Sequence, residues 1–336
     1  MQKNTMTKED HQSKELSSCK ICGKSFSSIK GNHLHISKAH KIPLKEYYKK
    51  YYKKQSFFSG KAIPFKNVNQ YFSTDFLNRE ELISWCLSEK PEITSVYIKK
   101  LLTDRKKEKQ LKYSLSHVEL ELCKLPSIDC YTKIFGSYSK ICKEIGLKNI
   151  LNKNLPSDFF SFECGSDSPR EDMKIFVDTR EQKPINFLNS ECMKLDFGDY
   201  TSASPYYDYT YIDRKSEGDF KSTLSGSNYD RFRRELDRAR KFNSYIFVLI
   251  ESDIPKITKN NVFSPHKSKL PYIWHNLKTI SQDYKDCCQF VFAGNRNGLK
   301  KLIPQILLYG KRLWNVDLQY FLDIKINEKR KNHLVS

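Results

Sequence analysis

The sequence contains no run of about 18 apolar residues, the length that a membrane-spanning helix requires. Its first residues, MQKNTMTKEDHQSKEL, include no apolar stretch of the kind found in a secretory signal. Glycine and proline are scarce, at twelve each among 336 residues, while 21 Phe and 20 Tyr supply bulk for real cores. Collagen-like, mucin-like and wholly disordered chains are therefore excluded, and we expect an intracellular protein of about two or three domains with no membrane partner.

Acidic residues are clearly outnumbered, with 39 Asp and Glu against 59 Lys and Arg, for a net charge of +20. Residues 1–70 carry 15 basic and four acidic side chains, which is over half of the excess in about a fifth of the length. An excess of this size indicates a polyanionic partner such as nucleic acid. Ten cysteines in an intracellular chain then indicate metal ligands and buried thiols rather than a disulfide framework.

Four potential metal ligands occur near the N-terminus at the spacing Cys19-x2-Cys22-x12-His35-x4-His40. This is the two-Cys, two-His zinc-finger pattern, in which two thiolates and two imidazoles complete a tetrahedron. Because so short a segment cannot bury enough apolar surface alone, the metal supplies its folding free energy. We expect a structural Zn²⁺ in a ββα finger over residues 17–42, within a basic arm of residues 1–54. Asn32 stands where such fingers keep an apolar residue, so Ile29 or Leu34 should fill that part of the core.

The run after the finger, LKEYYKKYYKK, is basic with interleaved tyrosines, which favours contact with DNA over contact with protein. Its candidate phosphate contacts are Lys49, Lys50 and Lys53. Residues 55–72 are irregular and predict a linker. Residues 73–150 read as helical and predict a DNA-binding region, which begins with an N-cap at Asn78.

A short motif lies within this helical region at residues 126–147. The sequence Phe135-Gly136-Ser137-Tyr138 joins two helical patterns, and the second pattern ends at Gly146-Leu147. The motif is similar to a repeat found beside phage homing endonucleases, in which a helix ends at Phe-Gly-Ser, an aromatic follows and a second helix closes at Gly-Leu. We expect Gly136 to permit the turn and Phe135 and Tyr138 to hold the helices together. An unrelated helical hairpin is the alternative.

Residues 151–171 predict a second linker, and beyond residue 173 short apolar runs alternate with helical patterns, which is typical of an α/β domain. Three charged motifs follow in order: VDTRE at 177–181, GDY at 198–200 and DRKSEGD at 213–219. An Asp followed after thirteen residues by Asp-x-Lys is the arrangement of metal-dependent phosphodiesterases. Two carboxylates hold a hard divalent cation that lowers the pKa of bound water, and the lysine orients that water or stabilises developing charge. Because side chains alternate along a strand, Asp213 and Lys215 should share one face.

These motifs resemble the nuclease domain of the XPF-type family, named for its eukaryotic DNA-repair endonuclease, whose pattern is V-D-x-R-E, then G-D-Y, then E-R-K-x3-D. The departure is Asp213, where the family has Glu, so the carboxylate reaches one methylene less far. The resemblance continues through RFRREL at 231–236 and the strand at 245–251, and covers roughly residues 172–310. It implies a restriction-endonuclease-like, PD-(D/E)xK α/β domain, which we place at residues 172–325.

The resemblance also implies roles for single residues. The catalytic set would be Asp178, Glu181, Asp199, Asp213 and Lys215. In it, Asp178, Asp199 and Asp213 would ligate or support Mg²⁺ or Mn²⁺, while Lys215 would serve the water. The supporting residues would be Arg180, Arg214 and Asp219, and the candidate DNA contacts of this domain are Arg231, Arg234, Lys267 and Lys269.

The sequence therefore predicts a multidomain chain with a small ββα zinc finger, a small helical domain and an α/β nuclease domain. The favoured function is a metal-dependent DNA endonuclease of the site-specific, homing type, which cuts double-stranded DNA and works inside a bacterial host if it is phage-encoded. The alternatives are a structure-selective repair or recombination nuclease and a DNA-binding regulator with an inactive nuclease core. Because XPF-type relatives often dimerise through this domain, a homodimer is a further expectation.

Overall fold

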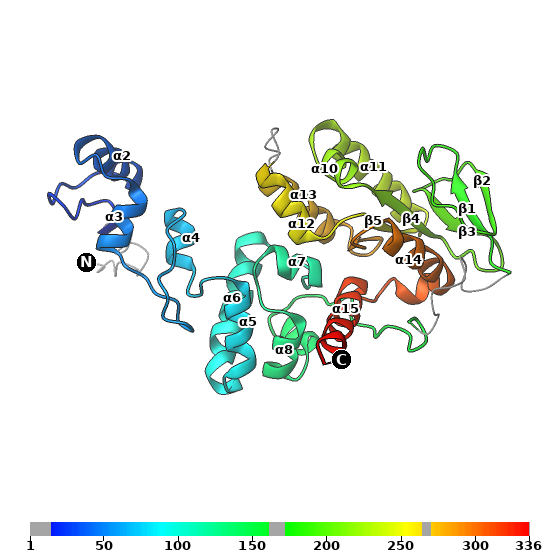
Figure 1. Ribbon diagram of the computed structural model, residues 1–336, viewed down its shortest axis with the longest axis horizontal. Helices are drawn as coiled ribbons and strands as arrows, with labels where there is room; N and C mark the ends of the chain where they lie inside the picture. The colour runs from blue at the N-terminus through cyan, green and yellow to red at the C-terminus, as the bar shows by residue number, and fades with distance from the viewer. Residues whose placement is uncertain (1–14, 161–171, 264–269, 336) are drawn as a thin grey trace, which may run out of the picture. The chain divides into compact units, whose positions relative to one another are not determined.

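A computed structural model describes residues 15–160, 172–263 and 270–335 (Figure 1). The chain divides into two compact units, Met1–Ser88 and Glu89–Ser336. This division falls inside the helical region expected at residues 73–150. Among the described residues, no helix combines the length and the apolar character that crossing a membrane requires.

The first unit is built around aromatic side chains. Its helices are α2 (Ile29–Ala39), α3 (Leu44–Tyr51), α4 (Val68–Ser73) and α5 (Arg79–Ser88). Asn78 caps α5 as expected, because its side chain accepts a hydrogen bond from Glu81 N at 2.9 Å. Tyr47 and Tyr48 from α3 are fully buried, and Tyr48 stacks on Phe65 with ring centres 4.2 Å apart. Tyr47 and Tyr48, two of the tyrosines interleaved among the lysines, are thus core residues, and contact between this basic run and DNA stays a prediction.

The finger itself departs from the expected ββα pattern. Its hairpin is reduced to one bridge between Ser18 and Ser25, followed by α2. Asn32 is buried and donates two hydrogen bonds, at 2.9 and 3.0 Å, to backbone carbonyls of the preceding segment. Leu34 is 55% exposed and Ile29 lies at the edge of the core. The expectation that Ile29 or Leu34 fills this part of the core is therefore wrong for Leu34. The side chain of Asn32 occupies the position, and its NH2 group donates both hydrogen bonds.

The second unit begins with helices that lead into the sheet. They are α6 (Pro91–Lys109), α7 (His117–Leu122), α8 (Ile128–Phe135) and α9 (Tyr138–Glu144). Gly136 ends α8 in the left-handed region, with φ of 83°, which a residue without Cβ adopts at no steric cost. Tyr138 packs on Tyr131 with ring centres 4.9 Å apart, whereas Phe135 is only half-buried. The helical hairpin forms, and its membership of the homing-associated repeat stays a prediction.

A six-stranded mixed sheet follows, in the order β2-β1-β3-β4-β5-β6. The strands are β1 (Ile175–Asp178), β2 (Ser190–Met193), β3 (Tyr200–Ser202), β4 (Thr210–Lys215), β5 (Tyr245–Ile250) and β6 (Cys288–Phe292). β3 runs antiparallel to both β1 and β4, while β4, β5 and β6 are parallel. The carboxyl end of β1 and the start of β3 therefore lie side by side, next to β4. The chain is a mixed α/β protein in this unit.

Helices cover both faces of this sheet (Figure 1). On one face are α10 (Glu217–Thr223), α11 (Gly226–Lys241) and α13 (Leu270–Asp283), and on the other α14 (Arg296–Tyr309), η1 (Gly310–Leu313) and the start of α15 (Leu318–Val335). The remaining helix, α12 (Ile254–Phe263), follows β5. In β5, Ile246, Val248 and Ile250 face the first set, and the alternate residues face the second. β4 alternates in the same way, so every second residue, including Asp213, belongs to the side of α10 and α11.

Buried polar contacts join α7 to the sheet unit. Glu119 on α7 is fully buried and forms an ion pair with Lys285, which is 2% exposed. Gln282 on α13 donates to Glu119 Oε1 at 2.6 Å, and His117 N donates to Asp317 Oδ2 at 2.6 Å. Removing one member of such a buried pair leaves an uncompensated charge, so these contacts fix α7 against the sheet domain.

Candidate active site

The candidate site begins where β3 meets β4, at a close approach that only glycine allows. Gly198 has φ of 58°, and a Cβ there would lie 2.6 Å from the carbonyl oxygen of Ile212. The next residue, Asp199, donates its backbone N–H to Ile212 O at 2.7 Å. Its carboxylate accepts a hydrogen bond from Arg214 N, also at 2.7 Å. The Gly-Asp pair of the GDY motif thereby holds the Asp199 carboxylate against β4.

Asp213 and Lys215 lie on one face of β4, as strand alternation predicts. Lys215 Nζ donates to Asp213 Oδ1 at 2.6 Å, and Asp213 is 3% exposed. The second carboxylate oxygen, Asp213 Oδ2, is buried and has no hydrogen-bond partner among the described residues. Burial lowers the pKa of Lys215, but the adjacent Asp213 carboxylate outweighs it and raises the pKa above the usual lysine value. The lysine is therefore a held cation beside a carboxylate with one unused oxygen.

Glu235 on α11 is a third acid at this place, and sequence reasoning did not single it out. Its Oε1 accepts from Gly198 N at 3.4 Å. Burial, followed by the charge of Asp213, raises the pKa of Glu235, and the same two causes raise the pKa of Asp199 far above its usual range. Glu235 borders the apolar stripe formed by Phe232, Leu236 and Ala239. An acid at the edge of an apolar helix face was the sequence signal that could have identified it as a site residue. Three acids that repel one another when ionised form a place that favours a cation.

Asp178 is occupied differently, at the end of β1. It is 2% exposed, and both of its oxygens accept hydrogen bonds from Arg180, at 2.7 and 2.9 Å. Leu195 N also donates to Oδ2 at 2.7 Å. Burial raises the pKa of this carboxyl, but these hydrogen bonds and the guanidinium outweigh it and hold the pKa below the usual value. Asp178 is thus a well-paired anion at the edge of the site.

Glu181 belongs to a second paired network. Arg214 donates to both of its oxygens, at 2.9 and 3.1 Å, and also to Glu251 at 2.9 Å. Arg296 donates to the same oxygen of Glu251 at 3.1 Å. Burial raises the pKa of Glu181, but Arg214 outweighs it and lowers the pKa. Alternating charges therefore lock β4 to the segment after β1 and to the segment after β5.

The structure separates the remaining predicted residues from this cluster or leaves them undescribed. Asp219 accepts from Ser216 Oγ at 2.6 Å at the start of α10 and is exposed. The DNA-contact candidates with exposed side chains are Arg231 and Arg234 on α11, together with Lys49, Lys50 and Lys53. Lys267 and Lys269 lie outside the described residues. Of the five arginines on α11, at 231, 233, 234, 238 and 240, only Arg233 and Arg240 form ion pairs with acids, at 3.3 and 2.6 Å, within the described chain.

The four expected zinc ligands come together in the first unit. Their ligand atoms all lie within 4.8 Å of one another: Cys19, Cys22, His35 and His40. The closest pairs are Cys22 Sγ to His35 Nε2 at 3.2 Å, Cys19 Sγ to His40 Nε2 at 3.5 Å, and the two Nε2 atoms at 3.1 Å. A tetrahedron with ordinary Zn–S and Zn–N bonds has edges of roughly 3.3 to 3.8 Å. The donor set is compatible with one zinc ion.

A second group of metal-ligand types lies between α7 and α15. His117, Glu121 and Asp323 also place ligand atoms within 4.8 Å of one another. His117 Nε2 already lies 3.0 Å from Asp323 Oδ2, and Tyr320 packs on the imidazole. This group therefore serves as a polar contact across the seam between the two helices. Among the described residues, Asp178, Asp199 and Asp213 do not converge this closely as a set of three.

Comparisons with known proteins give matches among solved structures. No family model matches the chain, and no curated protein matches it. Among solved structures, XPF from Aeropyrum pernix is similar over 42% of this chain and 69% of its own, at 16% identity and a TM-score of 0.32. The same protein in complex with DNA is similar over 40% of this chain and 62% of its own, at 17% identity and a TM-score of 0.31. What the chain does is therefore inferred from the arrangement of its own side chains.

Proposed function

We propose that this chain is a metal-dependent nuclease that hydrolyses phosphodiester bonds of DNA. The observation that carries the proposal is the buried Asp213 Oδ2, an acceptor without a partner, beside Asp199, Glu235 and the held cation of Lys215. A buried acceptor that lacks a donor costs free energy, and a bound cation would remove that cost. All the donors offered here are carboxylate oxygens, which suit hard cations such as Mg²⁺ or Mn²⁺.

The residues divide into those that would hold the metal and those that frame it. Asp213 and Asp199 would ligate it, and Glu235 would complete the acidic set. When bound, the cation would lower the pKa of a water molecule and offset charge on the phosphate. Lys215, held by Asp213, would stabilise negative charge that develops on phosphorus oxygens. Asp178 and Glu181, both paired with arginines, would position the strands and leave the chemistry to the acids at β4.

DNA is the proposed substrate because of charge and of the accessory parts. The net charge is +20, and Lys49, Lys50 and Lys53 are exposed in the unit that holds the zinc-ligand cluster. A zinc module and a helical hairpin suit recognition of duplex DNA, so we propose site-specific, homing-type cutting of double strands. A structure-selective repair or recombination nuclease and a regulator with an inactive core are the other readings. Dimerisation through the sheet unit stays a prediction from the resemblance.

Cleavage assays test the proposal. The full-length protein would be incubated with long linear duplexes and with forked or flapped oligonucleotides, with and without added Mg²⁺. We expect Mg²⁺-dependent breaks at a discrete duplex position, and loss of those breaks in Asp213→Asn with binding retained. Cutting of forks alone would select the repair reading. Binding without cutting of any substrate by the wild type would overturn the nuclease.

A further inference from the structure

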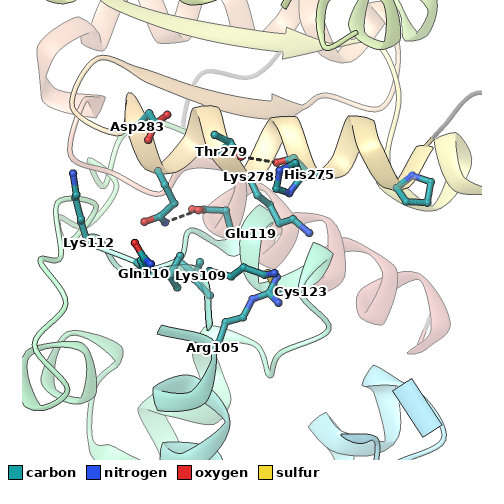
Figure 2. A pocket seen from close by; sticks show the side chains of 14 residues that line it. Arg105, Lys109, Gln110, Lys112, Glu119, Cys123, His275, Lys278, Thr279 and Asp283 are labelled. Atoms are coloured by element: carbon teal, nitrogen blue, oxygen red, sulfur yellow. Dashed lines mark hydrogen bonds between the residues drawn. The ribbon is translucent and has the colours of Figure 1, made fainter. Parts of the chain in front are cut away.

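A cavity of about 450 Å³ lies in the second unit, between α6 and α7 on one side and α13 on the other (Figure 2). Its volume falls within the range of roughly 300 to 1,000 Å³ that small-molecule sites occupy. Five basic side chains line it: Arg105, Lys109, Lys112, His275 and Lys278. Figure 2 shows Lys278 and His275 reaching down from α13, while Arg105 reaches up towards them from α6. None of these residues belongs to the candidate active site.

The two acids that line the cavity are already engaged. Glu119 accepts from Gln282 Nε2 at 2.6 Å, from Ser116 N at 2.8 Å and from the ammonium of Lys285. Asp283 forms an ion pair with Arg233 at 3.3 Å. Within the described parts of the chain, no carboxylate forms an ion pair with Lys278 or Lys112. Arg105 and Lys109 both pair with Glu108, at 3.5 and 2.7 Å. Lys278 and Lys112 are therefore the cations of this lining that have no carboxylate ion-pair partner among the described residues.

The position of Lys278 is the sharpest part of this arrangement. Basic residues at the end of α6, such as Lys109, are explained by the negative end of the helix dipole. Lys278 lies inside α13, which spans residues 270–283, so that explanation does not apply to it. It is half-buried, and burial lowers its pKa; Cys123 and Glu119 act in the opposite direction, while the charges of Arg105 and Lys109 lower the pKa further. Lys278 therefore lies near other cations in a half-buried position of the cavity lining. An anion bound in the cavity would offset the repulsion among these cations.

The cavity also has an apolar side. Leu111, Leu115 and Pro271 line it together with Cys123, whose sulfur accepts from Arg105 at 3.1 Å. A space of this size is larger than a lone phosphate needs, and apolar walls suit a planar or saturated ring beside the charged group. A cavity lined by both charged and apolar side chains suits one nucleotide, whose phosphate is anionic and whose base is largely apolar on its faces.

We propose that this cavity binds one nucleotide through its phosphate, with Lys278 and Arg105 as the principal contacts. The nucleotide is either a free mononucleotide or one unit of a bound DNA strand, and both present the same phosphate. The site is separate from the acids at β4, so the proposal goes beyond the nuclease activity and does not depend on it. Loss of one charge-assisted contact is expected to weaken binding about tenfold.

Equilibrium dialysis with thymidine 5′-monophosphate tests the proposal on the full-length protein in buffer without added Mg²⁺. We expect saturable binding to the wild type, about tenfold weaker binding to Lys278→Gln and to Arg105→Gln, and much weaker binding of thymidine, which lacks the phosphate. Lys301→Gln is the matched control, because Lys301 is exposed on α14 and does not line the cavity. Equal binding of thymidine and of the monophosphate to the wild type would overturn the proposal.

Two further arms fix the source of the phosphate and the state of the variants. A dT oligonucleotide whose binding weakens in Lys278→Gln identifies a strand as the ligand, whereas dependence with the monophosphate alone identifies a free nucleotide. If neither ligand depends on Lys278, the proposal is wrong. Lys278→Arg should restore binding, and unchanged thermal unfolding excludes a folding defect. Absence of Mg²⁺-dependent cleavage with monophosphate binding intact would count against the nuclease alone, and the reverse result against this site alone.

Discussion

The zinc-ligand cluster of the first unit and the acidic cluster of the second show two ways to arrange metal-ligand side chains. The four ligand atoms of the finger lie within 4.8 Å of one another and form a closed set. At β4 the acids stay further apart, Lys215 donates to one oxygen of Asp213, and the other oxygen has no hydrogen-bond partner in the described part of the chain. A closed four-ligand set is typical of structural metal sites, while an open set leaves room for substrate and water.

The two clusters also differ in the secondary structure that supports them. The finger has one bridge pair and one helix, with a core of aromatic side chains such as Tyr47 and Tyr48. The acids at β4 sit on a six-stranded sheet whose two faces are each packed by helices. The sheet can therefore fold without a metal, and the finger cannot hold two thiolates and two imidazoles in contact without one. Removal of one metal ligand should unfold the finger, whereas at the acids of β4 it should abolish activity and leave the sheet folded.

The largest expected effect is loss of zinc from the first unit. Cys22→Ser should abolish stoichiometric zinc binding and unfold the finger, because structural zinc contributes on the order of 10 kcal/mol to such modules. Zinc content and limited proteolysis would be measured together. Cys192→Ser, an exposed thiol on β2, is the control and should keep one zinc per chain. A full zinc content in Cys22→Ser would remove the closed site from the comparison.

The next effect should fall on activity and leave stability intact. Asp213→Asn should lower Mg²⁺-dependent cleavage by about 10³-fold or more, since a lost ligand removes most of the stabilisation that the cation supplies. Its thermal unfolding should stay close to that of the wild type, because relief of the repulsion among three acids offsets the lost ion pair with Lys215. Asp253→Asn, at the start of α12, is the matched control. Normal cutting by Asp213→Asn would show that the open cluster is not the active site.

The features that could be predicted from the sequence are those that depend on residues close together in the chain. Strand alternation is a short-range rule, so Asp213 and Lys215 were correctly expected on one face, and the spacing of the zinc ligands likewise belongs to one short segment. The partners of charged groups are long-range choices. Nothing near Asp178 showed that Leu195 N, 17 positions away, would donate to its carboxylate, and the pairing of Glu119 with Lys285 joins residues 166 positions apart.

The tyrosines after the finger show the same limit from the other side. Their alternation with lysines is compatible with a DNA-facing surface and with an amphipathic helix, and the pattern alone does not separate the two. Tyr47 and Tyr48 are buried because Ile63, Phe65 and Tyr71, from within the expected linker, pack over them. A segment read as a linker thus supplies part of the core.

Glu235 offers a smaller effect that sharpens the open site. Glu235→Gln should lower cleavage by about 10²-fold while stability is retained or slightly increased, because the acid acts beside the principal ligands and its burial raises its pKa. Asp230→Asn, an exposed acid on the same helix, should cut normally. Rates at several Mg²⁺ concentrations would be compared, and rescue of Glu235→Gln by higher Mg²⁺ is expected. Equal rates for Glu235→Gln and the wild type would limit the site to Asp199, Asp213 and Lys215.

The smallest expected effect concerns Asp317, a buried acid that belongs to neither the zinc-ligand cluster nor the acidic cluster. Asp317 is 7% exposed, and burial raises its pKa although the nearby His117 opposes this. A carboxyl whose folded pKa is raised contributes stability that is complete below the unfolded pKa, about 3.9, and is lost as pH rises through the folded pKa. Asp317→Asn removes this loss and keeps an acceptor for His117 N, so its free energy of unfolding should gain on the wild type as pH rises from 5 to 8. Denaturant unfolding should show a gain of about 0.5 to 2 kcal/mol. If the difference in free energy of unfolding between Asp317→Asn and the wild type did not change with pH, Asp317 would be ionised at no cost. The raised carboxyl pKa values of Asp199 and Glu235 would then set the open site apart from other buried acids of this chain.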